Sequence, residues 1–271
     1  MPFHGAGPAC VSFDRCSSEP TPLARDRMLH DRPLGRLLSR REAMRRLAAG
    51  AAWLITGSML ARQSAAGGPT PVCLFRPEQT EGPYFVDEEL RRSDIRPDPA
   101  TGEIKPGVPL VLTVALSRAD QGRCQPLPGA QVDIWHCDAD GLYSDVKDPG
   151  FDMTGRKFLR GYQLTDAQGE AKFLTIYPGW YHGRTVHIHI KVRAVAGAKR
   201  TFEFTSQMYF EDSLSDRIHA ALPYATKGKR TARNQDDRIF RRGGEHLVLA
   251  PTQTADGYAA TFAASLQFPP G

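Results

Sequence analysis

The fold is decided by a short stretch in the second half of the chain: Tyr177-Pro178-Gly179-Trp180-Tyr181-His182-Gly183-Arg184-Thr185-Val186-His187-Ile188-His189-Ile190. After its Pro-Gly turn comes an apolar, β-branched run over residues 185–192, which predicts a strand. Because side chains alternate between the two faces of a strand, His187 and His189 point the same way and Val186 and Ile188 point the other. Two imidazoles on one face can bind one metal ion, and the neighbouring turn and arginine favour this metal site over a solvated strand face.

Length and charge narrow the class of protein. The chain has 271 residues, 41% of them hydrophobic and 24% charged, which is ordinary for a globular protein that can bury a core without disulfides or metals. Its net charge of +5 is concentrated between Arg25 and Arg62, where nine arginines face three acidic residues. From Gln63 onward, acidic and basic residues balance. A neutral globular part argues against nucleic acid as a partner.

Residues 1–66 are predicted to be an N-terminal extension with an export signal, and residues 67–271 to be the globular domain. Ser39-Arg40-Arg41-Glu42-Ala43-Met44-Arg45 resembles the twin-arginine export motif, and an apolar run over 47–60 follows. Ser64 and Ala66 then offer a small-residue cleavage site. The apolar run is shorter than the about 20 residues of a membrane span, so we expect a periplasmic or extracellular protein with no stable membrane insertion after processing. The start stays open between Met1 and Met28.

Export changes the interpretation of the cysteines. Cys73, Cys124 and Cys137 remain after processing, and an oxidising compartment permits one disulfide and leaves one thiol. Turn-like, proline-flanked surroundings favour pairing of Cys73 with Cys124, whereas Cys137 follows an alternating strand and is expected to be buried. A zinc site is disfavoured because the chain has no Cys-x-x-Cys pair.

Short segments of strand character, separated by Gly and Pro, continue from residue 67 to the end of the chain. We expect strands over 108–117, 130–137, 161–165, 170–176, 185–195, 201–210, 246–250 and 257–268, with a hairpin turn at 166–169. Residues 214–222 predict a helical turn or two, and the polar stretch 223–244 predicts a long loop, either mobile or folded over the site. This pattern predicts an all-β protein, an antiparallel β-sandwich whose long loops carry the metal site.

A second motif supplies the rest of the predicted site. Trp135-His136-Cys137-Asp138-Ala139-Asp140-Gly141-Leu142-Tyr143 leaves a strand and enters a loop, and Pro77-Glu78-Gln79-Thr80-Glu81-Gly82-Pro83-Tyr84-Phe85 lies upstream. With Gly-x-Tyr, Pro-Gly-x-Tyr and Arg-x-x-His-x-His in this order, the chain resembles the intradiol ring-cleavage dioxygenases, relatives of protocatechuate and catechol dioxygenases. It is most similar to their exported bacterial branch. The resemblance runs from about Cys73 to Phe268.

The resemblance implies one non-haem Fe(III) per chain, bound by Tyr143, Tyr181, His187 and His189. Phenolate is a hard anionic donor, and two phenolates stabilise Fe(III) over Fe(II), unlike the two-His-one-carboxylate set of ferrous oxygenases. The implied reaction is cleavage of a catechol-type aromatic by O2, between its two hydroxylated carbons, to a cis,cis-muconate-type diacid. Catechol and O2 are therefore the expected partners, and the oligomeric state stays open, with a homo-oligomer among the options.

The same resemblance assigns roles to individual residues. Tyr181 is expected to leave the metal when substrate binds and to take one substrate proton, whereas Tyr143 stays bound. Arg184 is expected to stabilise negative charge that develops on the substrate, and Gln207 to donate a hydrogen bond to the same oxygens. A motif that lines the pocket in relatives matches Thr80, Glu81 and Tyr84, which are expected substrate contacts.

Several nearby residues are assigned no chemistry. Tyr177 is expected to pack or to line the rim, and His136 and His182 to face solvent or the pocket wall. Trp135 and Trp180 are expected to form core or pocket wall.

Two other functions stay open. One is an exported β-sandwich binding module with a vestigial site, which predicts that at least one metal ligand is missing. The other is a divalent-metal hydrolase that uses the histidines with a carboxylate such as Asp145.

The link from Tyr181 to Arg184 is also shorter than in the better-known relatives, which predicts a more open pocket.

Overall fold

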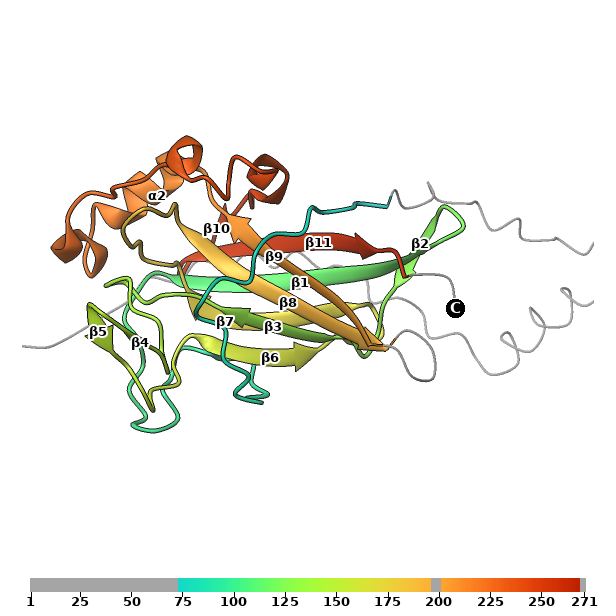
Figure 1. The fold of residues 1–271 in the computed structure, drawn as a ribbon, viewed down its shortest axis with the longest axis horizontal. Helices are drawn as coiled ribbons and strands as arrows, with labels where there is room; N and C mark the ends of the chain where they lie inside the picture. Colours follow the sequence, from blue (N-terminus) through green and yellow to red (C-terminus); the bar gives the residue numbers. More distant parts are fainter. Residues whose placement is uncertain (1–72, 196–200, 269–271) are drawn as a thin grey trace, which may run out of the picture. The chain divides into compact units, whose positions relative to one another are not determined.

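The computed structural model describes residues 73–195 and 201–268, and it confirms an all-β sandwich (Figure 1). The predicted export segment and its boundary at residue 66 lie outside the described residues. The strands are β1 (Pro109–Asp120), β2 (Arg123–Pro126), β3 (Gln131–Trp135), β4 (Lys147–Asp148), β5 (Phe151–Asp152), β6 (Arg160–Leu164), β7 (Glu170–Ile176), β8 (His187–Val195), β9 (Thr201–Tyr209), β10 (Thr252–Gln253) and β11 (Tyr258–Leu266). Between β9 and β10 lie the α-helix α2 (Asp212–His219) and the 3-10 turns η1 (Tyr224–Lys227), η2 (Asn234–Asp236) and η3 (Gly244–Leu247). No helix within the described ranges is long and apolar enough to cross a membrane.

Two sheets form the sandwich. The first has the order β10-β11-β1-β2, with β7 also paired to β1, and the second has the order β6-β3-β8-β9. Strands β1 and β11 run parallel, whereas the other strand pairs of the described residues are antiparallel. The first sheet is therefore mixed rather than purely antiparallel. A parallel pair needs a long connection, and among the strands of the described residues β1 is the first and β11 the last.

The predicted hairpin at 166–169 is wrong, although its turn is present. Asp166 Oδ1 accepts hydrogen bonds of 2.9 Å from the backbone N–H groups of Gln168 and Glu170, and Gly169 has a φ of 77°. The turn connects β6 in the second sheet with β7 in the first, so the chain crosses between layers. Turn chemistry reverses the chain, but which strands pair afterwards depends on how their apolar faces pack into the core.

Most predicted strands are found, with shifted ends. The strand predicted over 246–250 is wrong, because η3 occupies its first residues and Val248 makes a single bridge to Tyr209. The helix predicted over 214–222 corresponds to α2, which begins two residues earlier. β2, β4, β5 and β10 are missing from the sequence prediction because segments of two to four residues have no measurable periodicity.

The core lies between the two sheets. Leu110 and Leu112 of β1 are fully buried in one cluster with Ile188 and Ile190 of β8. Burying each such side chain contributes about 1.5–3 kcal/mol. Because these isoleucines face the core, the alternate positions of β8, which include its two histidines, lie on the outer face of the second sheet.

The segment over residues 73–90 crosses from the first sheet to the second. The predicted pairing of Cys73 with Cys124 is confirmed, with Cα atoms 5.4 Å apart, and Cys137 is buried and free as expected. Farther along, the backbone N–H of Gln79 donates to the carbonyl oxygen of Thr205 in β9 at 2.9 Å. The segment thereby covers the outer face of the second sheet beside the histidines.

Candidate metal centre

Three segments bring four donor side chains to one place. The loop after β3 carries Tyr143, the turn between β7 and β8 carries Tyr181, and β8 begins at His187 and has His189 on the same face. Tyr143, His187 and His189 are buried, whereas Tyr181 is half-buried. The side chains that the sequence singles out therefore meet, and their role as metal ligands stays a prediction.

The donor atoms surround His187 Nε2. It lies 3.3 Å from Tyr143 Oη, 3.3 Å from Tyr181 Oη and 3.1 Å from His189 Nε2. Ligand atoms bonded to one ion at about 2.0–2.1 Å are roughly 3.0–3.4 Å apart, so this spacing fits a shared metal ion. Two phenol oxygens and two imidazole nitrogens also suit a ferric ion, because phenolate oxygen is a hard anionic donor.

Both histidines are neutral, as imidazoles that bind a cation must be. His187 Nδ1 lies 2.7 Å from the carbonyl oxygen of Thr185, so Nδ1 carries the proton and Nε2 directs its lone pair into the site. Burial, reinforced by the charge of Arg184, holds the pKa of His187 well below its usual value, and burial does the same for the pKa of His189. Nδ1 of His189 is buried without a hydrogen-bond partner.

The two phenols need a cation to ionise. Burial raises the pKa of Tyr143 and of Tyr181 well above the usual value. A bound metal ion inverts this preference, because it is the largest local charge and favours the deprotonated ligand. The four donors are thus two neutral imidazoles and two phenols that can ionise, and none of them is a carboxylate. A trivalent cation bound by this set would stabilise both phenolates.

Aromatic rings hold the donors in place. Trp135 stacks on His189 with ring centroids 4.9 Å apart and planes 5° apart, because the register of β3 and β8 places the two residues opposite each other. Tyr84 stacks on Tyr143 with centroids 4.5 Å apart. Gly82 approaches so closely that a Cβ there would lie 3.3 Å from His189 Cε1, and its φ of 74° also favours glycine.

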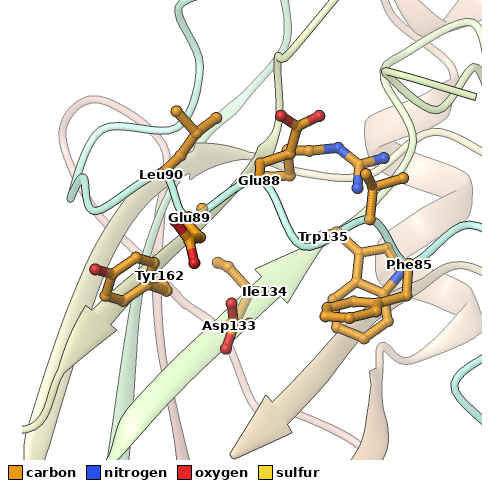
Figure 2. Close-up of a pocket in the computed structure, with 11 residues that line it drawn as sticks. Phe85, Glu88, Glu89, Leu90, Asp133, Ile134, Trp135 and Tyr162 are labelled. Atoms are coloured by element: carbon orange, nitrogen blue, oxygen red, sulfur yellow. The ribbon is translucent and has the colours of Figure 1, made fainter. Parts of the chain in front are cut away.

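The region between Trp135 and the segment over residues 85–90 is tightly packed. A cavity of ≈ 10 Å³ is present there, which is about enough for one water molecule. Figure 2 shows Phe85 beside Trp135 at this cavity, with Glu88, Asp133 and Tyr162 also on its walls. On the side of the turn that carries Tyr181, by contrast, His182 and Gly183 are exposed.

Arg184 reaches the same point as the donors without being one of them. Its Nη1 lies 3.3 Å from Tyr181 Oη and 3.4 Å from His187 Nε2. Burial by itself would lower the pKa of Arg184, but Tyr181 and Asp237 beside it raise that pKa, so the guanidinium stays charged. A permanent positive charge is thus directed at the donor cluster.

Gln207 contacts Arg184. The register of β8 and β9 places it opposite His189, and its Oε1 accepts a hydrogen bond of 2.5 Å from Arg184 Nη2. Its Nε2 donates to the carbonyl oxygen of Thr80 at 2.8 Å, and Tyr209 Oη donates to its Oε1 at 3.0 Å. The amide therefore supports the arginine, and its predicted direct contact with substrate stays a prediction.

Arg160 was missed by sequence reasoning. It is 2% exposed, and no carboxylate within the described residues forms a salt bridge with it. Instead it donates to Ser144 Oγ at 2.8 Å, to the carbonyl oxygen of Ser144, and to the carbonyl oxygen of Tyr84 at 3.3 Å. Ser144 directly follows Tyr143 in the chain, and the ring of Tyr84 stacks on the ring of Tyr143. One buried guanidinium therefore binds the backbone just after Tyr143 and the backbone of the residue stacked on it. Burial lowers the pKa of Arg160 to about 10, which leaves it charged at neutral pH.

The predicted substrate contacts lie around the donors in different ways. Tyr84 Oη donates to Asp148 Oδ2 at 2.9 Å, and Glu81 forms an ion pair with Lys191. Thr80 is exposed and contributes its carbonyl oxygen to Gln207. Their contact with substrate stays a prediction.

The flanking residues separate into three groups. Tyr177 is buried and contacts Ser215 Oγ at 2.7 Å, so it packs as expected, and Trp135 and Trp180 are buried walls as expected. His182 is exposed, as predicted. The solvent alternative for His136 is wrong: it is buried and its Nε2 lies 2.7 Å from Thr175 Oγ1, because it follows β3, which is central in its sheet and covered on both faces.

The stretch over 223–244 is folded over the site. Lys227 of η1 donates to the carbonyl oxygen of Asp140 in the Tyr143 loop and lies 5.0 Å from the ring centroid of Trp180. Asp237 contacts Arg184 Nε at 2.8 Å. Of the two alternatives that the sequence left open for this stretch, the structure shows the second.

The hydrolase alternative gains no support from the geometry. Asp145 Oδ1 accepts a hydrogen bond of 2.6 Å from the backbone N–H of Gly155. Throughout residues 73–195 and 201–268, no three side chains of His, Cys, Asp or Glu form a group that could hold a metal ion. The histidines have tyrosines, not carboxylates, as their neighbours.

Comparison with known proteins identifies the family. The dioxygenase family model matches residues 80–239, more than half of the chain. The solved structure of an intradiol ring-cleavage dioxygenase from Tetranychus urticae is 30% identical, covers 72% of this chain and 95% of that chain, and superposes with a TM-score of 0.61. The chain therefore belongs to the intradiol ring-cleavage dioxygenase family, as its motifs predict.

Further relatives are dioxygenases too. A chlorocatechol 1,2-dioxygenase from Pseudomonas putida is 30% identical in an alignment of 165 positions that covers 53% of this chain and 58% of that protein. A catechol 1,2-dioxygenase from Acinetobacter lwoffii is 30% identical in an alignment of 154 positions that covers 47% of this chain and 45% of that protein. The chain spans about half the length of the curated relatives it matches. The 3-chlorocatechol 1,2-dioxygenase of Rhodococcus opacus, at 20% identity and a TM-score of 0.51 over 73% of this chain and 74% of that one, shares the fold.

Proposed function

We propose that this protein cleaves a catechol-type aromatic with O2 between its two hydroxylated carbons and releases a cis,cis-muconate-type diacid. The convergence of two phenols and two imidazoles around His187 Nε2 carries the proposal, because this donor set suits Fe(III). The atoms balance, because catechol keeps all of its own atoms and gains both atoms of O2, which become part of the two carboxyl groups of the diacid. Ferric iron held by Tyr143, Tyr181, His187 and His189 would supply a Lewis acid for the two substrate oxygens.

The protein residues account for charge and proton handling. Tyr181 is half-buried, lies in the exposed turn and accepts a hydrogen bond from Arg184, so it is the phenol placed to exchange with substrate and to take its proton. Arg184 then stabilises negative charge on the bound substrate, since its Nη1 is directed at the donor cluster. Trp135 and Tyr84 exclude water from the other side by stacking on His189 and Tyr143.

The reaction is tested with labelled oxygen. Purified protein is given catechol and ¹⁸O2, and the product is examined by mass spectrometry and proton NMR. We expect both labelled atoms in one product that has no aldehyde proton. An aldehyde signal would indicate cleavage beside the two hydroxylated carbons instead, and absence of oxygen uptake across a panel of substituted catechols would refute the proposal. A colourless protein with stoichiometric zinc, after growth with iron, would refute the metal assignment.

We also propose that the protein is exported through its Arg40-Arg41 motif. The disulfide between Cys73 and Cys124 supports this, because such bonds persist in oxidising compartments. Replacing both arginines with lysine should leave a full-length precursor in the cytoplasm, detected by fractionation and immunoblotting. Mature protein outside the cytoplasm in this double variant would contradict the twin-arginine route.

A further inference from the structure

Asp237 is a buried carboxylate outside every motif of the sequence analysis. It is 1% exposed and lies in the stretch over 223–244 that covers the donor cluster. Its Oδ1 accepts hydrogen bonds from the backbone N–H groups of Ile239, at 2.7 Å, and Phe240, at 3.3 Å. Its Oδ2 accepts from Arg184 Nε, at 2.8 Å, and from the backbone N–H of Thr185, at 3.0 Å. One oxygen therefore closes a local turn, and the other reaches the site.

Arg184 is held by a different segment at each of its three nitrogens. Nε donates to Asp237, Nη2 donates to Gln207 of β9, and Nη1 is left facing Tyr181 Oη and His187 Nε2. A guanidinium is planar, so two such contacts determine its plane and the direction of its third nitrogen. Without Asp237, the guanidinium keeps its hydrogen bond to Gln207 and its 3.3 Å contact with Tyr181 Oη, but Tyr181 is the ligand expected to move when substrate binds, so the direction of Nη1 is no longer fixed.

We propose that Asp237 is a positioning residue that orients Arg184 so that its Nη1 faces the reacting atoms. The inference rests on the proposed function, in which Arg184 stabilises charge that develops on the substrate. Electrostatic stabilisation depends on donors that are already aimed before the charge appears. Loss of the aiming contact therefore lowers the catalytic rate while the metal ligands stay in place.

The contact pattern makes Asp237→Asn a selective test. An asparagine can keep its carbonyl oxygen at the Oδ1 position and so retain the turn to Ile239 and Phe240. Its NH2 group then faces Arg184 Nε and the N–H of Thr185, all of which are donors. Asp236→Asn is the matched control, because Asp236 is adjacent and exposed and binds the backbone N–H of Arg233 instead.

We expect Asp237→Asn to lower kcat for catechol by about ten- to a hundredfold, the range typical for the loss of a partner that orients a site residue. Iron content, the visible band and its shift on anaerobic catechol binding should stay within about twofold of wild type. Asp236→Asn should match wild type in all of these. Wild-type kcat in Asp237→Asn, or loss of its iron, would overturn the inference.

A double-mutant cycle separates positioning from general structural support. If Asp237 acts through Arg184, Asp237→Asn lowers kcat in the wild-type background but has little further effect in Arg184→Ala. Urea unfolding of the four purified proteins gives a readout that does not depend on activity. Asp237→Asn should lower the unfolding midpoint of wild type more than that of Arg184→Ala, where the carboxylate has already lost its charged partner.

The outcomes distinguish failure of the positioning role of Asp237 from failure of the proposed function. Equal effects of Asp237→Asn in both backgrounds, on kcat and on the midpoint, would overturn the positioning inference while the proposed function stands. Absence of oxygen uptake by wild type would overturn the proposed function. In that case the unfolding cycle still decides whether Asp237 and Arg184 are coupled.

Discussion

The two tyrosines of the donor cluster have the same chemistry and opposite surroundings. Tyr143 is 1% exposed, stacks on Tyr84, and lies in a loop whose backbone Arg160 binds at the carbonyl oxygen of Ser144. Tyr181 is half-buried in a short turn whose next two residues, 182 and 183, are exposed. Each tyrosine has an arginine nearby, but the two arginines bind different parts of the chain.

This difference separates a ligand built to stay from one able to leave. Arg160 donates to backbone oxygens and leaves Tyr143 Oη in contact with His187 Nε2. Arg184 donates to Tyr181 Oη itself, and so offers that oxygen a partner other than a metal. A phenolate stabilised by a guanidinium is easier to release. The surroundings thus support the prediction that Tyr181 exchanges with substrate and Tyr143 does not.

The largest expected effect separates the two tyrosines directly. Tyr143→Phe should lower iron affinity by at least about a hundredfold, above the upper range for loss of an outer partner, because it removes a fixed ligand. Tyr181→Phe should retain more iron and lose turnover instead. Iron per chain after dialysis against a chelator, together with the visible spectrum, measures both. Equal loss of iron in the two variants would show that the surroundings do not distinguish them.

The next effect tests the arginine on the Tyr181 side. Arg184→Ala should leave iron content and colour nearly unchanged, since guanidinium has no lone pair to offer a metal. Catechol should still shift the colour, but turnover in an oxygen electrode should fall by about a hundredfold or more, the scale for loss of one positioned electrostatic donor. A variant that loses its iron, or that keeps full activity, would contradict this role.

The arginine on the Tyr143 side should behave differently. Arg160→Gln should weaken iron binding by about ten- to a hundredfold, because it releases the backbone of Ser144, which follows Tyr143, and of Tyr84, which stacks on Tyr143. It should also lower the free energy of unfolding by about 1–3 kcal/mol, since buried carbonyl oxygens lose donors. Val132→Ala, a core substitution in the same sheet, is the control for lost stability alone. If both variants lose iron equally, Arg160 supports only the fold.

The smallest effect is a pH dependence on the Tyr181 side. Burial lowers the pKa of His219 to about 4, and its Nε2 contacts the carbonyl oxygen of Pro178 at 2.9 Å, in the turn before Tyr181. Between about pH 6.5 and 4 the unfolded chain therefore binds more protons at this residue, so stability falls as the pH falls, by about 3 kcal/mol at most. Urea unfolding of wild type and His219→Gln across this range should show a steeper fall for wild type. Parallel curves would contradict the assignment.

Local patterns in the sequence were enough for the two histidines and for most strands. The alternation in 185–192 placed His187 and His189 on one face, whereas both phenols came from the resemblance of the Gly-x-Tyr and Pro-Gly-x-Tyr motifs to those of the intradiol dioxygenases. The alternation is a property of neighbouring residues, and it is kept in any fold that buries the apolar face. The crossing turn at 166–169 shows the limit, because its residues encode a reversal but not the sheet that the next strand joins.

The sequence by itself thus determined an all-β family member with two histidines and two tyrosines available for a metal. The resemblance implied that these four bind one metal ion and that Arg184 acts beside them, whereas only the tertiary structure revealed that Arg160 supports Tyr143 and that Asp237 and Gln207 hold Arg184. Asp237 lies 53 positions from Arg184, and Arg160 lies 76 from Tyr84. Contacts over such separations leave no periodic trace, because each depends on how whole strands and loops pack rather than on the residues beside it.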